Sequence, residues 1–163
     1  MDQLWSPWRF RYVSEGTRTE GCIFCAMAAG DASHDREHLI LERARHNFVV
    51  LNLYPYTTGH AMIVPYAHVA RLTDLDGETL GEMMDMAKKF QVALESVYHP
   101  EGYNLGMNQG RVAGAGVADH VHLHVLPRWI GDTNFMAVVG ETRLHPEELH
   151  TTYDKLAAFL RRG

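Results

Sequence analysis

The chain lacks the defining features of several protein classes. No apolar run in its 163 residues is long enough to cross a bilayer, so we expect neither a membrane-spanning helix nor a membrane partner. The opening MDQLWSPWRFRY lacks the continuous apolar centre and the cleavage site of a secretory signal, so we expect a cytoplasmic location. The formal net charge is −5, whereas binding to a nucleic-acid polymer needs clustered Lys and Arg, so that partner is not expected.

Internal repeats, low-complexity tracts and linkers are absent as well. Apolar residues make up 46% of the chain, which is enough for a real hydrophobic core. We therefore expect a single domain over residues 1–163.

Cysteine is scarce, because Cys22 and Cys25 are the whole cysteine content. Without a secretory signal, their CxxC spacing favours half of a zinc site over a disulfide. A redox pair is the alternative, although the thioredoxin-like motif opens a helix directly after a strand, and GCIFCAMAAGD has no clear preceding strand. Half a zinc site needs two further ligands.

The hydrophobic pattern predicts an α+β fold. Short apolar runs bounded by turn residues predict five strands, of which the first two form a hairpin, at residues 38–42, 47–52, 60–65, 103–108 and 120–127. Near-helical spacing of apolar residues predicts a long helix over residues 76–98, capped by Asp74 or Asp76. We expect its methionines in the core: Met83, Met84 and Met86. Residues 145–162 predict a second helix, with acidic residues in its first turn and arginines in its last.

Three histidines occupy alternate positions in HVHLHVLPRW: His120, His122 and His124. On a strand that ends at Pro127, all three project to one face, about 6.5 to 7 Å apart, while the intervening apolar residues enter the core. Imidazoles are costly to desolvate unless each finds a partner, so this pattern indicates a bound metal, ligand or anionic substrate.

Two chemistries suit such a face. Neutral imidazoles can coordinate zinc and leave an open position that activates water. Alternatively, one imidazole nitrogen attacks phosphorus while its neighbours orient it and protonate the leaving group. The spacing alone does not choose between them.

The string HVHLHVL fits the histidine triad pattern, and the chain resembles the histidine triad (HIT) superfamily of nucleotide hydrolases and transferases. The similarity runs from Cys22 to about Asp132, through CIFC, HNFVVLNLYPYTTGHAMIVPYAHV, a long helix and YNLGMNQG. The segments LWSPWRFRY and VLPRWIGDTNF resemble the fragile histidine triad and bacterial diadenosine tetraphosphate phosphorylase branches. The resemblance implies a HIT-like fold, a five-stranded antiparallel sheet with one long helix and a C-terminal helix, paired into a homodimer with a continuous sheet. The domain would comprise an aromatic extension (1–20), a HIT core (22–132) and a C-terminal extension (133–163).

The resemblance also implies roles for individual residues. His122 would be the nucleophile that attacks the α-phosphorus and forms a covalent nucleotidyl-histidine. His124 would hydrogen-bond the phosphate or the leaving oxygen, and His120 would support this arrangement or bind metal. His60 would border the phosphate site, and Asn52 the ribose. The chemistry agrees, because an imidazole with a reference pKa of about 6.5 is largely unprotonated at neutral pH and becomes a good leaving group once phosphorylated.

The glycine-rich stretch GMNQGRVAGAG precedes the triad, where glycines let backbone amides approach phosphate oxygens. The candidate substrate contacts are Asn108, Gly114 and Gly116, and the candidate cations are Arg111 and Arg128. Many relatives carry Ser or Thr two or three residues before the triad, but this chain has GVAD there, so a hydroxyl contact to the phosphate is missing.

By resemblance to zinc-carrying members, His68 and His120 would complete a Cys2His2 site with Cys22 and Cys25, and His46 is a reserve ligand. A zinc ion there is structural and leaves the nucleophile free. Mg²⁺ could accompany the substrate.

We therefore expect an enzyme that cleaves dinucleoside polyphosphates, with adenine as the base and with water or inorganic phosphate as the acceptor. The phosphate acceptor is mildly favoured by the opening segment and by VLPRW. Three alternatives remain: a nucleoside phosphoramidase, a nucleotide-binding signalling module with slow turnover, and a hydrolase that uses the triad as metal ligands.

Overall fold

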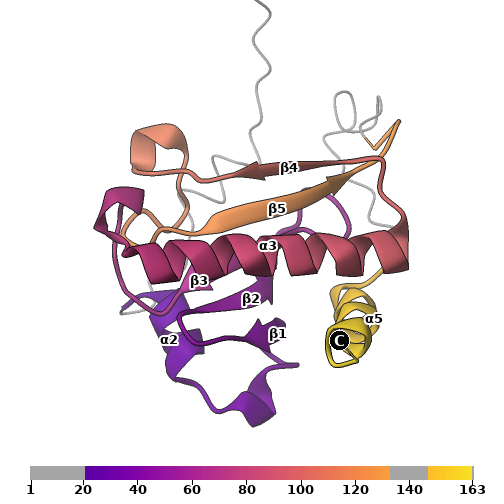
Figure 1. The fold of residues 1–163 in the computed structure, drawn as a ribbon, viewed down its shortest axis with the longest axis horizontal. Coiled ribbons are helices and arrows are strands. Elements are labelled where there is room, and N and C mark those ends of the chain that lie inside the picture. The colour runs from indigo at the N-terminus through magenta and orange to yellow at the C-terminus, as the bar shows by residue number, and fades with distance from the viewer. Residues whose placement is uncertain (1–20, 133–146, 163) are drawn as a thin grey trace, which may run out of the picture.

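The computed structural model describes residues 21–132 and 147–162. Residues 1–20, which form the aromatic extension, and residues 133–146 and 163 lie outside the described residues, so the expectations placed on them stay predictions. Within the described part, a five-stranded antiparallel sheet is covered on one face by a long helix (Figure 1). This arrangement confirms the predicted α+β fold.

The sheet has the strand order β1-β2-β3-β5-β4, with every neighbouring pair antiparallel. The strands are β1 Ile40–Arg43, β2 Asn47–Leu51, β3 Ala61–Pro65, β4 Gly102–Gly106 and β5 Leu123–Arg128. β5 is the last strand in the chain but lies between β3 and β4, so the strand that contains His124 occupies an interior position of the sheet.

Three α-helices accompany this sheet in the described part of the chain. They are α2 Ile23–Ala29, α3 Gly77–Tyr98 and α5 Leu149–Leu160, and short 3-10 turns lie at Ala32–His34, Leu72–Asp74 and Arg111–Ala113. α3 packs on β2, β3 and β5, while α5 packs against α3 and β1. None of the described helices combines the length and apolar character needed to cross a membrane.

α3 begins where the sequence predicts. The carboxylate of Asp76 accepts a hydrogen bond from the Thr79 amide at 2.7 Å and caps the helix. Its buried stripe includes Met83 and Met86, but Met84 is 51% exposed, so the prediction that it belongs to the core is wrong. Each residue advances about 100° around a helix, which turns Met84 away from the stripe that contains Met83.

α5 is shorter than predicted, and the charged residues expected in its first and last turns lie outside the helix. Glu147 and Glu148 precede the helix and Arg161 follows it, so the predicted acidic first turn and basic last turn are wrong. The carboxylate of Glu147 accepts hydrogen bonds from the hydroxyls of Tyr98 and Thr152. These contacts tie Glu147 to α3 and to the first turn of α5.

β5 also differs from the predicted strand 120–127. It begins at Leu123, because the backbone before it leaves the sheet and the Val121 amide donates to the carbonyl oxygen of Val69 at 2.7 Å. It continues past Pro127 to Arg128. Pairing with β3 ends at Val125, so Pro127 has only β4 beside it, and a missing amide proton is tolerated there.

Candidate active site and metal cluster

His122 is 4% exposed, and its Nδ1 lies 2.9 Å from the carbonyl oxygen of His120. A carbonyl oxygen can only accept, so Nδ1 carries the proton and Nε2 of the neutral ring carries a lone pair. Burial lowers the pKa of His122 below its ordinary value, although the hydrogen bond to the His120 carbonyl partly opposes this. The ring is therefore neutral at physiological pH, and its Nε2 has the lone pair that a nucleophile needs.

His124 has the opposite arrangement, fixed by a chain of hydrogen bonds. The Tyr56 amide donates to Nδ1 of His60 at 3.1 Å, so neutral His60 carries its proton on Nε2. That Nε2 lies 2.9 Å from Nδ1 of His124 and donates to it, which leaves the His124 proton on Nε2. The ring centroids of His122 and His124 are 4.8 Å apart. A ring nitrogen with a lone pair and an N–H donor therefore belong to neighbouring rings.

Asn52 and Tyr56 surround His60 on the turn after β2. Asn52 is buried, with Nδ2 3.4 Å from Nδ1 of His60 and Oδ1 accepting from the Tyr54 amide at 3.0 Å. The ring of Tyr56 stacks on His60 with centroids 4.9 Å apart. No sequence pattern pointed to Tyr56, because a turn aromatic has no distinctive spacing.

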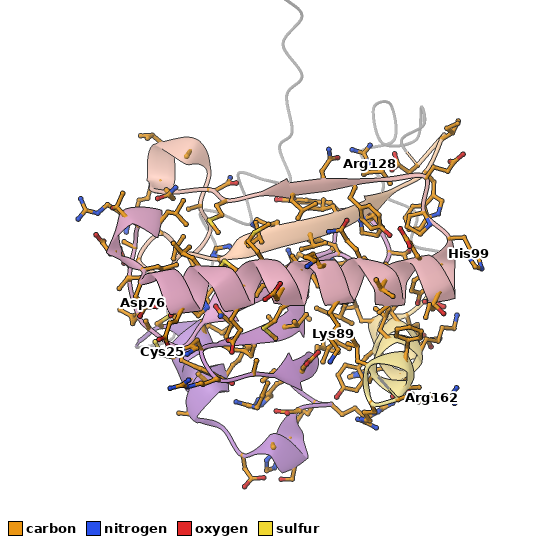
Figure 2. All side chains as sticks on the ribbon, in the orientation of Figure 1. Cys25, Asp76, Lys89, His99, Arg128 and Arg162 are labelled. Carbon is orange, nitrogen blue, oxygen red and sulfur yellow. The ribbon has the colours of Figure 1, made fainter. Side chains whose placement is uncertain are left out.

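Four further side chains converge at the end of the molecule where Figure 2 labels Cys25 and Asp76. Nδ1 of His120 lies 3.3 Å from Sγ of Cys22 and 3.3 Å from Nδ1 of His68, which in turn lies 3.2 Å from Sγ of Cys25. All four ligand atoms lie within 4.8 Å of one another. This metal cluster, Cys22, Cys25, His68 and His120, could hold a metal ion.

The donor set fits zinc. Nε2 of His120 donates to the carbonyl oxygen of Pro65 at 2.8 Å, so the lone pair lies on Nδ1, which faces the thiols. Two sulfurs and two imidazole nitrogens make a closed tetrahedral shell, the usual form of a structural site. His46 is not part of the cluster: its Nε2 lies 3.5 Å from the carboxylate of Glu78, and its amide donates to Glu82.

The three triad rings contact two neighbouring groups of side chains. His120 turns Nδ1 to the metal cluster, whereas the rings of His122 and His124 contact each other. Residues 120–122 lie outside the strand, which begins at Leu123.

The glycine-rich loop before the triad is stabilised by hydrogen bonds between its own residues. Nδ2 of Asn108 donates to the carbonyl oxygen of Ala113 at 2.7 Å. Gly114 adopts φ 83°, which favours glycine, and its amide donates to the carbonyl oxygen of Arg111 at 2.9 Å. In this conformation the Gly114 amide already donates to Arg111. It could contact a phosphate, as predicted, only if the loop changed its conformation.

The two candidate cations have different surroundings. Arg128 forms a close ion pair with Asp132 and donates to Asn104 at 2.7 Å, on the β4–β5 side of the sheet (Figure 2). Arg111 is exposed and lines a hollow of about 450 Å³ together with Arg71 and Asp119.

Phe24, like Tyr56, is a residue of this site that the sequence analysis did not predict. Its ring centroid lies 5.0 Å from that of His122 and 5.4 Å from that of His120, and the side chain is 3% exposed. Its place between the two cysteines of CIFC is the signal that could have revealed it.

Comparison with known proteins agrees with this geometry. The family model of the HIT domain matches residues 35–129. The chain belongs to the HIT family. It is 36% identical over 162 residues to an AP-4-A phosphorylase of Mycobacterium tuberculosis, covering 96% of this chain and 83% of that one. It is 33% identical over 107 residues to an adenosine 5'-monophosphoramidase of Schizosaccharomyces pombe, covering 66% and 74%.

Among solved structures, a zinc-bound histidine triad family protein from Mycobacterium smegmatis has the same fold as this HIT protein. The TM-score is 0.70 at 28% sequence identity, covering 87% of this chain and 94% of the other. The predicted family is thus confirmed.

Proposed function

We propose that this HIT protein cleaves adenine dinucleoside polyphosphates, such as diadenosine tri- or tetraphosphate, at the α-phosphate through a covalent nucleotidyl-His122 intermediate. The observation that carries the proposal is the pairing of an unprotonated Nε2 on His122 with a protonated Nε2 on the adjacent His124. The similarity to the AP-4-A phosphorylase supports the substrate class.

In the first step, the Nε2 lone pair of His122 attacks the α-phosphorus. The bond from that phosphorus to the bridging oxygen breaks, and this oxygen takes the Nε2 proton of His124. The shortened nucleotide leaves, and the adenylyl group stays on His122. His60 then keeps the newly deprotonated His124 in place through its Nε2–H.

In the second step, an acceptor attacks the same phosphorus and gives its proton to Nε2 of His124. The bond between phosphorus and Nε2 of His122 breaks, the nucleotide is released, and both rings regain their starting protonation. Water as acceptor gives a hydrolase and inorganic phosphate a phosphorylase. The 36% identity to the AP-4-A phosphorylase favours phosphate.

Cys22, Cys25, His68 and His120 would hold a zinc ion, which when bound supplies a structural cross-link between α2 and the triad segment. The four protein ligands fill a tetrahedral shell, and Nε2 of His122 is not among them. The donor set therefore favours the nucleophilic mechanism over a triad that binds a catalytic metal.

A second candidate is the hydrolysis of adenosine 5'-phosphoramidate, favoured by the similarity to the monophosphoramidase. The same two histidines serve this reaction, because the leaving amine needs a proton from His124 even more than an oxygen does.

The deciding experiment is incubation with diadenosine tetraphosphate, with and without inorganic phosphate, followed by separation of the nucleotides. Phosphorolysis yields ADP and ATP only when phosphate is present, whereas hydrolysis yields AMP and ATP without it. Rapid quenching in alkaline denaturant, which preserves the acid-labile bond between phosphorus and nitrogen, and mass spectrometry are expected to find an adenylyl group on His122.

The matched variants are His122→Asn and His150→Asn, the latter at an exposed position on α5. We expect a loss of about 10³-fold or more in kcat for His122→Asn and none for His150→Asn. An unchanged rate in His122→Asn, or an adduct on another residue, rules out the proposed nucleophile.

A further inference from the structure

Phe24 lies between two ligands of the metal cluster and is the one buried residue of the seven-residue helix α2. Cys22 caps the start of this helix, and Cys25 follows Phe24 directly. At the other end of α2, Arg43 donates to the carbonyl oxygens of Met27 and Ala28. The helix is thus held at both ends, with the cysteines at the end that carries the Phe24 ring.

The Phe24 ring contacts the nucleophile directly. Its plane is tilted 56° to that of His122, with ring centroids 5.0 Å apart, and it meets the edge of His120 at 76°. The hydrogen bond from Nδ1 of His122 to the His120 carbonyl fixes one ring atom and leaves the ring free to tilt about it. The rings of Phe24 and His124 both contact the His122 ring and restrict that tilt.

The metal cluster reaches His122 by two further routes. His120 is at once a member of the cluster and the acceptor for Nδ1 of His122. Val69, which follows the cluster residue His68, accepts the amide of Val121 at 2.7 Å. These two connections hold the backbone of the triad in place, whereas the Phe24 contact restricts the orientation of the His122 ring itself.

We infer that Phe24 is a positioning residue that couples the metal cluster to the ring orientation of His122. The inference rests on the proposed role of His122 as nucleophile. When the cluster is assembled, its two cysteines fix the backbone on either side of Phe24, and the ring holds Nε2 of His122 in line with the phosphorus. When the cluster is disrupted, α2 loses its attachment at that end and the ring no longer restrains the nucleophile.

The kinetic test compares Phe24→Leu with Phe90→Leu, a substitution at an equally buried phenylalanine on α3. We expect Phe24→Leu to lower kcat on diadenosine tetraphosphate by about 10- to 100-fold, because a nucleophile displaced by about 1 Å loses that much. KM should change by less than about twofold, since substrate binding is retained. Equal losses of kcat in the two variants, at matched loss of thermal stability, would reduce Phe24 to ordinary core packing.

A second readout needs no turnover. The imidazole ¹⁵N signals of His122 are recorded in chelator-treated protein before and after addition of Zn²⁺ alone. In the wild type we expect Zn²⁺ to shift the His122 signals, and in Phe24→Leu this shift should be strongly reduced while Zn²⁺ still binds. Shifts of equal size in both proteins, or no shift in the wild type, would overturn the coupling. If no nucleotide substrate is cleaved, the proposed function fails while this measurement still decides whether Phe24 transmits the state of the cluster.

Discussion

At the scale of single residues, three histidines of one short motif have three different environments. His120 donates from Nε2 to Pro65 and turns Nδ1 to the cysteines, whereas His122 donates from Nδ1 and presents Nε2. Nδ1 of His124 accepts a hydrogen bond from Nε2 of His60, so His124 carries its own proton on Nε2. The role of each imidazole follows from the hydrogen bond made by its other nitrogen.

The link from His60 to His124 gives a prediction about leaving groups. His60→Leu removes the donor that keeps the His124 proton on Nε2, so protonation of the leaving oxygen should fail more often. We expect kcat on diadenosine tetraphosphate to fall by about 10-fold or more, within the range of general-acid effects. The p-nitrophenyl ester of AMP, whose leaving group needs no proton, should be cleaved at nearly the wild-type rate in the same assay.

His60→Gln is the matched control, because its side-chain amide can still donate to His124. An equal loss with both substrates in His60→Leu would show that His60 supports the fold of the site and not proton transfer.

At the scale of elements, Glu82 on α3 holds the turn between β1 and β2 against the helix. Its carboxylate accepts from the amides of His46 at 2.7 Å and Arg45 at 3.0 Å, and from Nδ2 of Asn47 at 2.9 Å. Burial raises the pKa of Glu82, but these hydrogen bonds lower it by more, so the pKa lies below its ordinary value. One helix residue thereby sets how α3 lies on the first hairpin.

The pH dependence of this contact has a definite sign. Because the folded-state pKa of Glu82 is the lower one, its contribution is fully present above the unfolded-state pKa of about 4.3 and is lost as the pH falls through the folded value. We expect Glu82→Gln to cost about 1–3 kcal/mol in free energy of unfolding at pH 7. In urea denaturation the difference from wild type should shrink below about pH 4.3. A constant difference from pH 7 to pH 3.5 would contradict this assignment.

At the scale of the whole molecule, the metal cluster joins segments that are far apart in the chain. Cys22 and His120 are 98 residues apart, and a metal ion bound by both would close most of the described chain into a loop. Constraining so long a loop in the unfolded state favours the folded one.

We therefore expect removal of zinc to lower the thermal midpoint by at least about 5 °C, since about 1 kcal/mol corresponds to about 2–4 °C in a chain of this size. Cys25→Ser should have a similar midpoint to the chelated wild type, and chelator should no longer change it. Scanning calorimetry with and without chelator measures both. A midpoint that chelator leaves unchanged in zinc-loaded wild type would exclude a structural metal here.

The assembly of two chains is a further prediction at this scale. β4 stands at one edge of the sheet, where an edge strand offers backbone groups for pairing, and its Leu105 is 40% exposed. We predict a homodimer that pairs these edges, and light scattering should give twice the monomer mass. Leu105→Lys should shift the mass toward the monomer, whereas Val92→Lys, at an exposed apolar position on α3, should not. A monomeric wild type would refute the prediction.

The sequence by itself determined the five strands, the two longer helices and the family. Short apolar runs bounded by turn residues located the five strands to within a few residues, near-helical spacing located α3, and HVHLHVL identified the family, because all three are local patterns. Local periodicity did not predict the exposure of Met84 or the first residue of β5. Burial of a side chain and pairing of a strand depend on which other elements pack against them.

Only the tertiary structure decided how the histidines divide their tasks. Placing β5 next to β3 brings His124 to His60, 64 residues earlier in the chain, and the departure of residues 120–122 from the sheet brings His120 to the cysteines. The protonation of each ring depends on partners such as the carbonyls of Pro65 and His120 and the amide of Tyr56. Backbone groups are the same at every position of a sequence, so only folding determines which of them an imidazole meets.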